Sequence, residues 1–311
     1  MKNQDVSTFR EQYLACCQNQ KRLSGKTIKA YRIDLAQFFA FVSEQSEPLG
    51  RASVQAYIAQ LHQRFQPKSA KRKTASLKAF FAWLEYEELL VDNPFQKIRT
   101  KFKEPFCLPR TIPLEHIQRM LNAAYEALRA QKLSAFHRGT LLREATVMEL
   151  LFATGMRVSE LCTLRREDVD LREGVIKIHG KGAKERLIQV GNPEVLACLQ
   201  SYRSAFEEEI KKTDYFFINR LGNQLAEQSV RAMLKKYAAA CGLSANITPH
   251  MFRHSFATLL LEEDVDIRYI QSMLGHSSIT TTQIYTHVAA KKQKDILTQR
   301  HPRNRLAVNT R

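Results

Sequence analysis

Long apolar runs are missing from this 311-residue sequence, and so are enough acidic residues to balance the basic ones. No apolar stretch approaches the ~20 residues that a membrane span requires. The opening MKNQDVSTFR lacks the apolar centre of a signal peptide. Asp and Glu number 31 against 48 Lys and Arg, a net charge of +17. We therefore expect no membrane span and a polyanionic partner, such as nucleic acid or an anionic membrane surface.

Cysteine is present without any pattern that would give it a structural role. No CxxC pair occurs, and the spacing does not suggest a disulfide framework. We expect reduced thiols in a cytosolic protein and no metal site built on cysteine. The sequence also contains neither a P-loop nor a carboxylate cluster. The six cysteines are Cys16, Cys17, Cys107, Cys162, Cys198 and Cys241.

The first hundred residues have the apolar period of a small helical bundle. Ser24 is the predicted N-cap of a helix whose apolar residues recur every three or four positions up to Val42. A second helix is expected near 54–63, and Pro67 opens a third. Basic side chains crowd the third helix; phosphate contact is the favoured interpretation, with an ordinary solvated face as the alternative. The candidate contacts on this helix are Lys68, Lys71, Arg72, Lys73 and Lys78.

From residue 92 to residue 113 the apolar period fails, and four prolines alternate with basic residues. This composition is typical of a linker between domains. Its basic content suggests that it also follows a phosphate backbone. The predicted parts are a helical N-terminal domain over 1–98, a basic linker over 99–110 with the candidate contacts Lys101 and Lys103, and a second domain over 111–311.

The second domain is predicted to be mainly helical with a small antiparallel sheet. Strands are expected at 175–179 and 186–190, around a basic turn flanked by glycines that includes Lys184 as a further candidate contact. The segment 214–219 is a candidate third strand. The expected helices cover 114–130, 141–153, 158–165, 193–212, 227–241, 250–262, 266–274 and 279–298.

Two basic residues of the second domain stand where the backbone favours an anion. Arg157 follows a glycine break just before a helix, where free N–H groups and a guanidinium together suit a phosphate. An ion pair with Glu160 is the alternative. Lys181 lies between two glycines, which allow a ligand to approach the backbone closely. An ordinary solvated turn is the alternative there.

A segment rich in histidine and arginine starts a later helix. Thr248 is its expected N-cap and Pro249 its first residue, so His250 and Arg253 share a face near the positive helix end. His250 and His254 also have the spacing of half a zinc motif. The glutamate of that motif is absent and no third ligand has a suitable spacing, so we expect no zinc.

Two more residues complete an ordered pattern. His276 follows Leu-Gly at the end of a predicted helix, and Tyr285 stands among threonines in the next, where a half-buried aromatic is the alternative. In chain order the pattern is Arg, Lys, His-x-x-Arg, His, Tyr. The stretches ATGMRVSELCTL, HGKGAKERLIQV, TPHMFRHSFATLLLE and IQSMLGHSSITTTQIYTH resemble the tyrosine recombinases of the lambda-integrase family, most closely the Xer type.

The resemblance covers 150–300 densely and the N-terminal region loosely. It implies a mainly α-helical fold with a small antiparallel sheet, in which a helical core-binding domain and a catalytic domain clamp DNA. It implies a cytoplasmic, nucleoid-associated site-specific recombinase that forms a Holliday junction on paired double-stranded DNA sites, without cofactor. A homotetramer joined through its C-terminal segments is also implied, and packing of that segment on its own subunit is the alternative. Whether a second recombinase takes part stays open.

The implied chemistry is the cleavage of a phosphodiester, which is a poor electrophile. Its negative oxygens repel a nucleophile, and its alkoxide is a poor leaving group. The resemblance implies that Tyr285 attacks the phosphorus to form a 3′-phosphotyrosyl link, while Arg157 and Arg253 donate to the nonbridging oxygens. The other implied roles are general acid to the leaving 5′ oxygen for Lys181, proton transfer at the tyrosine for His250, and a hydrogen bond to the phosphate for His276.

Three features depart from the Xer pattern. The stretch 125–138 is longer, Asp264 stands where the family has glycine or asparagine, and a tail follows residue 303. These features favour a relative carried by a mobile element. Two alternative functions stay open: a tyrosine-dependent enzyme that relaxes DNA without paired sites, and a DNA-binding regulator with a silent site.

Overall fold

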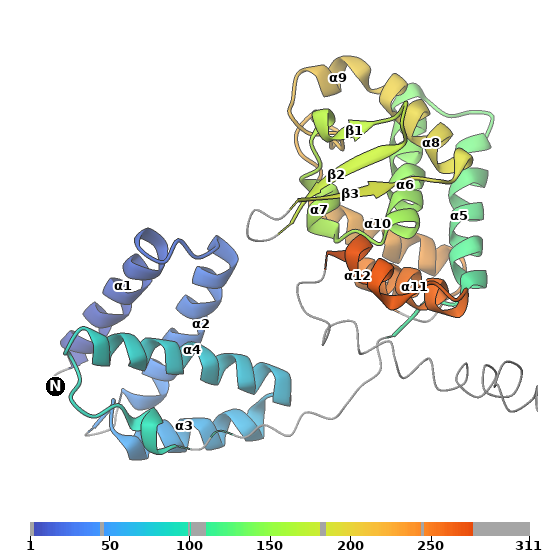
Figure 1. Cartoon of the computed structure of the whole chain (residues 1–311). Helices are drawn as coiled ribbons and strands as arrows, with labels where there is room; N and C mark the ends of the chain where they lie inside the picture. The colour runs from blue at the N-terminus through green and yellow to red at the C-terminus, as the bar shows by residue number, and fades with distance from the viewer. Residues whose placement is uncertain are drawn as a thin grey trace, which may run out of the picture. The chain divides into compact units, whose positions relative to one another are not determined.

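The chain divides into two compact units, Met1–Phe106 and Cys107–Arg311 (Figure 1). The computed structural model describes residues 3–43, 47–98, 100, 110–180, 185–243 and 246–275. Within these ranges, every helix is too short or too polar to span a bilayer.

The first unit is a bundle of α-helices. Ser24 caps the second helix as predicted, because its side chain accepts a hydrogen bond from the Thr27 N–H. The first helix was not predicted; its buried residues Tyr13, Leu14 and Cys17 crowd into little more than one turn and give no long apolar period. The elements are α1 (Asn3–Asn19), α2 (Gly25–Val42), α3 (Arg51–Arg64), α4 (Pro67–Tyr86) and the 3-10 helix η1 (Pro94–Lys97).

Aromatic rings fill the core of this unit. Phe38, Phe80 and Phe81 are fully buried, and the ring of Phe81 meets that of Phe95 edge-on at a centroid distance of 5.4 Å. Phe95 belongs to η1, which lies inside the predicted N-terminal domain of residues 1–98 and packs on this core. The apolar period is lost from residue 92 onward although η1 is still packed, because a single buried ring leaves no periodic signal.

The second unit is mainly α-helical with one small antiparallel sheet, which confirms the predicted fold class. Its elements are α5 (Leu114–Arg129), α6 (Ala135–Thr154), α7 (Val158–Cys162), η2 (Arg166–Asp168), β1 (Val169–Asp170), β2 (Val175–His179), β3 (Glu185–Gln189), α8 (Pro193–Ala205), α9 (Glu207–Lys211), α10 (Glu227–Ala240), α11 (Pro249–Glu262) and α12 (Ile267–Leu274).

The three strands pair in the order β1-β2-β3, with Val175 opposite Gln189 and His179 opposite Glu185. The segment 214–219 does not supply the third strand, contrary to our expectation. It makes only isolated bridges at residues 215 and 218, while Phe216 and Phe217 are buried in the core. A run of buried aromatics therefore serves as core filling here, and β1 occupies the sheet edge instead.

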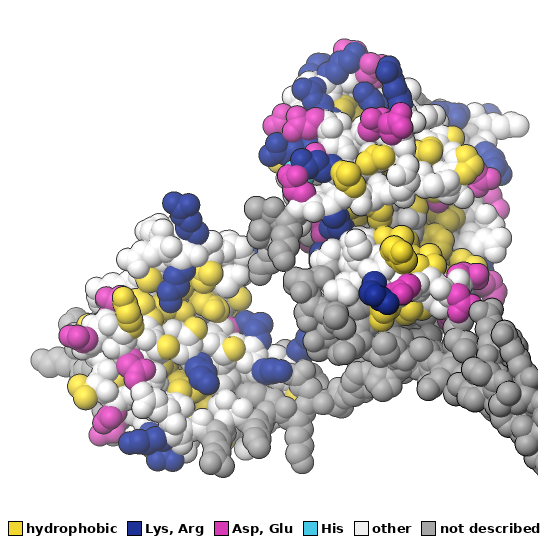
Figure 2. All heavy atoms as spheres, viewed as in Figure 1, with side chains coloured by type: hydrophobic (Ala, Val, Ile, Leu, Met, Phe, Trp, Pro, Cys, Tyr) yellow, Lys and Arg dark blue, Asp and Glu magenta, His cyan; other side chains and the backbone are white. Residues whose placement is uncertain are grey.

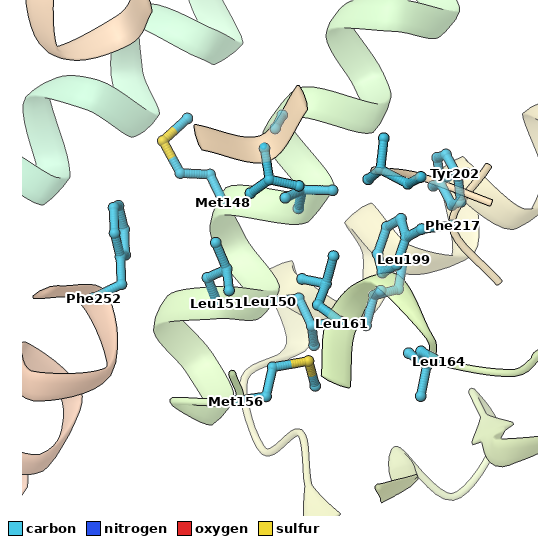
Figure 3. Packing of buried hydrophobic residues seen from close by; sticks show 14 of the residues in the cluster. Met148, Leu150, Leu151, Met156, Leu161, Leu164, Leu199, Tyr202, Phe217 and Phe252 are labelled. Atoms are coloured by element: carbon cyan, nitrogen blue, oxygen red, sulfur yellow. The ribbon is translucent and has the colours of Figure 1, made fainter. Parts of the chain in front are cut away.

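Helix α6 forms the centre of the second core. Met148, Leu150 and Leu151 of this helix are buried, and Figure 3 shows them between Phe252 of α11 and the side chains around Leu161. The helix begins six residues earlier than predicted, because the Ser134 side chain caps it by accepting from the His137 N–H. Because α5 extends to Arg129 and α6 begins at Ala135, most of the stretch 125–138 is helical.

Two other helix boundaries bear on the sequence-based expectations. Thr248 caps α11 as predicted, since its side chain accepts a hydrogen bond from the Met251 N–H. The expected single helix over 193–212 is wrong: it is split into α8 and α9 at Phe206, whose φ of −123° leaves helical geometry. Phe206 packs on the core of the second unit, and the guanidinium of Arg143 of α6 lies 6.0 Å from the centre of its ring, so tertiary contacts compete here with the local helical preference.

Candidate active site

Gly155 determines how the chain passes from α6 to α7. It ends α6 with a φ of +59°, a left-handed conformation that favours glycine. A Cβ atom added here would lie 2.5 Å from Cδ1 of Phe256, so the position also has no space for a side chain. The chain can then turn sharply, and Arg157 becomes the N-cap residue of α7.

Arg157 is held by the carboxylate of Glu160. Its Nη1 lies 2.7 Å from Glu160 Oε1, and its backbone N–H donates to Glu160 Oε2 at 2.8 Å. The ion pair that the sequence offered as the alternative is thus present. The Arg157 side chain is still 37% exposed, so the contact with Glu160 orients the guanidinium without covering it.

Glu160 binds a second arginine on the sheet. Arg186 of β3 forms a fork, with Nη2 2.7 Å from Glu160 Oε2 and Nη1 3.1 Å from Glu160 Oε1. Burial of Glu160 opposes its ionisation, but the hydrogen bonds from Arg186 and Arg157 outweigh it and lower the pKa of Glu160. The carboxylate therefore stays charged between two guanidinium groups.

Arg253 of α11 is almost entirely buried, with 2% of the residue exposed. Its Nη1 donates to the carbonyl of Gly155 at 2.8 Å, and its Nη2 donates to the carbonyl of Leu274 at 2.6 Å. These bonds join the end of α6, α11 and the end of α12. Arg253 and Gly155 are about a hundred residues apart in the sequence, and their contact lies only two positions before Arg157.

His250 lies exposed in the first turn of α11, with its ring 5.3 Å from that of His254. Burial of His254, together with the nearby His250 and Arg253, lowers the pKa of His254 to about 4. His254 is therefore neutral at neutral pH. No group of three possible metal ligands occurs in the ranges that the structure describes.

Several predicted site residues lie outside the described residues: Lys181, His276, Tyr285, Lys184, Lys101 and Lys103. The structure describes elements next to three of them. β2 and β3 lie on either side of the turn with Lys181 and Lys184, and Gly275 precedes His276. Gly275 ends α12 with a φ of +63°.

One buried carboxylate binds two of the basic side chains of α4. Asp34 of α2 has no exposed surface and accepts hydrogen bonds from Arg72 and Lys73 of α4. Lys73 is 4% exposed and also donates to Gln37 at 2.6 Å, so its prediction as a phosphate contact is wrong: its ammonium group ties two helices together.

The other candidates on α4 remain at the surface. Lys68, Lys71 and Lys78 are exposed, and about half of the Arg72 side chain is exposed beside its contact with Asp34. On the visible faces of both units, Lys and Arg side chains lie at several places rather than in a single block, and on the second unit many stand beside Asp and Glu (Figure 2). These residues stay predictions for DNA contact.

Comparison with known proteins assigns the family. Residues 112–292 match the phage integrase family, and residues 11–88 match the SAM-like N-terminal domain of phage integrases. A protein of Agathobacter rectalis named tyrosine recombinase is 52% identical over 96% of this chain and 98% of its own length. The chain belongs to the tyrosine recombinases. It is an enzyme of the DNA strand-transferring kind, as the sequence pattern predicted.

The Xer-type resemblance of this recombinase is also confirmed. Tyrosine recombinase XerD of Staphylococcus saprophyticus is 35% identical over 96% of this chain and all of its own length. The fold is similar to that of the XerH site-specific recombinase bound to a palindromic difH substrate, with a TM-score of 0.72 at 21% identity. That match covers 93% of this chain and 84% of XerH.

One polar residue of the recombinase site was missed at the sequence level. Arg186 shares a strand face with Ile188, which is 5% exposed, and the Arg186 side chain is 11% exposed. Successive strand residues point to opposite faces, so a charged residue two positions from a core isoleucine faces inward. That alternation was the available signal, because an inward arginine requires a partner.

Proposed function

We propose that this recombinase cuts and rejoins DNA at specific sites through a covalent link between Tyr285 and a 3′ phosphate. Tyr285 Oη attacks the phosphorus, the bond to the 5′ oxygen breaks, and Lys181 gives that oxygen a proton. His250 assists removal of the phenolic proton, and His276 binds the phosphate. The 5′-hydroxyl of another strand reverses these steps, because the phosphotyrosyl link retains the energy of the phosphodiester.

One observation carries this proposal: two guanidinium groups from distant segments are fixed around the same turn. Arg253 donates to the carbonyl of Gly155. Arg157, two residues after Gly155, is held by an ion pair with Glu160. Two fixed positive charges suit a phosphate whose negative charge grows during attack. Since they need no rearrangement when charge develops, their effect is largest in the transition state.

The partner and assembly follow from the same proposal. The net charge of +17 and the exposed Lys68, Lys71 and Lys78 of α4 support DNA contact by the first unit. The linker lysines Lys101 and Lys103, and Lys184 of the hairpin turn, are assigned to the DNA backbone as well. We assign 1–98 to core binding and 111–311 to catalysis.

Strand exchange between two duplexes needs four active sites. We therefore assign a homotetramer on paired sites in nucleoid DNA, with the segment after Tyr285 packing on a neighbouring subunit. The structure of a lambda integrase tetramer bound to a Holliday junction has a similar fold, with a TM-score of 0.65.

The test uses a library of nicked duplexes with randomised sequence around the nick. Cleavage near a nick releases a short strand whose 5′-hydroxyl diffuses away, so the covalent adduct is trapped. We expect wild type to form adducts whose sequenced ends define the target, and Tyr285→Phe to bind the same duplexes without forming adducts. Adducts at the wild-type level with Tyr285→Phe would assign the nucleophile elsewhere.

A further inference from the structure

We propose that Arg186 is a positioning residue for the cleavage reaction: anchored on the end of α12, it holds Glu160 and thereby aims Arg157 at the phosphate. The inference rests on the proposed function, because it takes Arg157 as the group that offsets phosphate charge. Arg186 would not itself touch the substrate.

The first part of the argument is the anchor. Arg186 Nε donates to the main-chain carbonyl of Met273 at 2.8 Å, in the last turn of α12. Its guanidinium is also close to Gly275, where an added Cβ would lie 3.1 Å from Arg186 Nη1. With 11% of its side chain exposed, Arg186 has its plane set by the protein rather than by solvent.

The second part is the shape of the contact with Glu160. The two terminal nitrogens of Arg186 bind both oxygens of Glu160, so the carboxylate can neither rotate nor shift independently. The same two oxygens receive the backbone N–H and Nη1 of Arg157. The orientation of Arg157 therefore depends on a carboxylate that Arg186 fixes from the opposite side.

The third part is what the carboxylate would do without Arg186. Glu160 is 7% exposed, and its burial alone would disfavour the charged form. A carboxylate with only Arg157 as a partner would be free to rotate and would hold that guanidinium less precisely. Lysine at position 186 keeps the positive charge but has no planar fork, so it cannot reproduce the two-point contact.

The experiment measures single-turnover adduct formation on a nicked duplex selected from the library by wild type. Arg186→Lys should slow adduct formation about 100-fold, a loss typical of a small misplacement of a catalytic group. Its DNA affinity should stay within about twofold of wild type, because the binding contacts lie elsewhere. A matched control is Arg166→Lys: Arg166 is exposed in the same unit and donates to the Lys211 carbonyl at 2.8 Å, so its loss should leave the rate unchanged.

Two further readouts separate positioning from general damage. In an Arg157→Ala background, Arg186→Lys should slow the reaction no more than about threefold, because both changes act on the same group. With a neutral methylphosphonate at the cleaved position, less charge needs to be offset, so the deficit of Arg186→Lys should shrink at least about tenfold. If Arg186→Lys does not fold, as judged by its thermal transition, Glu160→Gln should give the same deficit and the same relief.

A wild-type rate for folded Arg186→Lys, or a deficit of equal size in the Arg157→Ala background and on the methylphosphonate, would overturn the inference alone. A wild-type rate for Arg157→Ala, or no adducts from wild type on the library, would overturn the proposed function together with the inference.

Discussion

Asp34 provides a stringent test of how the first unit is held together. Replacing it by asparagine keeps the size of the side chain but leaves Lys73 charged, 4% exposed and without its anionic partner. Breaking a buried ion pair from one side costs about 3–5 kcal/mol, whereas half-exposed Arg72 should add little because water screens it. The loss is a large fraction of the 5–15 kcal/mol, roughly, that stabilises a typical domain.

The single tryptophan of the chain makes the measurement specific to this unit. Trp83 is 7% exposed in the first core, so its fluorescence during urea unfolding follows that core alone. With a dependence of about 2 kcal/mol per molar urea, the midpoint of Asp34→Asn should fall by about 2 M.

A matched control is Asp92→Asn, because Asp92 is exposed in the same unit. It should change stability by no more than about 0.5 kcal/mol. Adding Lys73→Met to Asp34→Asn should restore part of the stability, since it removes the uncompensated charge. A midpoint for Asp34→Asn within about 0.25 M of wild type would refute the reasoning.

Two predictions concern the second unit. Gly155→Ala forces a Cβ to 2.5 Å from Phe256 in a left-handed backbone and should cost about 2–5 kcal/mol in thermal unfolding, whereas Gly222→Ala, with positive φ but open space, should cost only about 1 kcal/mol. Equal losses would contradict the packing argument. Burial raises the pKa of Glu149, which accepts a hydrogen bond from Tyr125, so ionisation above about pH 4.3 weakens the folded state. Glu149→Gln should therefore have a higher melting temperature than wild type at pH 7. The two melting temperatures should be equal at about pH 3.5, below the ordinary Glu pKa. A difference that does not change with pH would contradict this origin.

Helix starts and the hairpin could be predicted from the sequence because their signals are local. Ser24 and Thr248 cap helices where a capping side chain precedes an apolar period, and the glycine-flanked hairpin has its strands within one residue of the prediction. The predicted order of charged and polar residues was also sufficient for the family. All of these signals lie within a few positions of the residues they concern.

Predictions failed where the deciding contact was distant in the sequence. Lys73 and Lys71 look alike on α4, but Lys73 is internal because it binds Asp34 and Gln37 of α2, some forty residues earlier. Phe206 ends α8 where its ring packs on the core and lies beside Arg143, more than sixty residues earlier. The start of α4 is thus predictable from the sequence, but which of the helix's basic side chains are buried is not.

The nearly complete burial of Arg253 shifts an entropic cost from the encounter with an anion to the folding of the chain. A free arginine loses roughly 2 kcal/mol of rotamer freedom when it is immobilised. Here two main-chain carbonyls and the surrounding core have already frozen the side chain. Any anion that arrives meets a stationary cation. Beside it, Arg157 is oriented by Glu160 but keeps 37% of its side chain in solvent, so its guanidinium stays accessible to that anion.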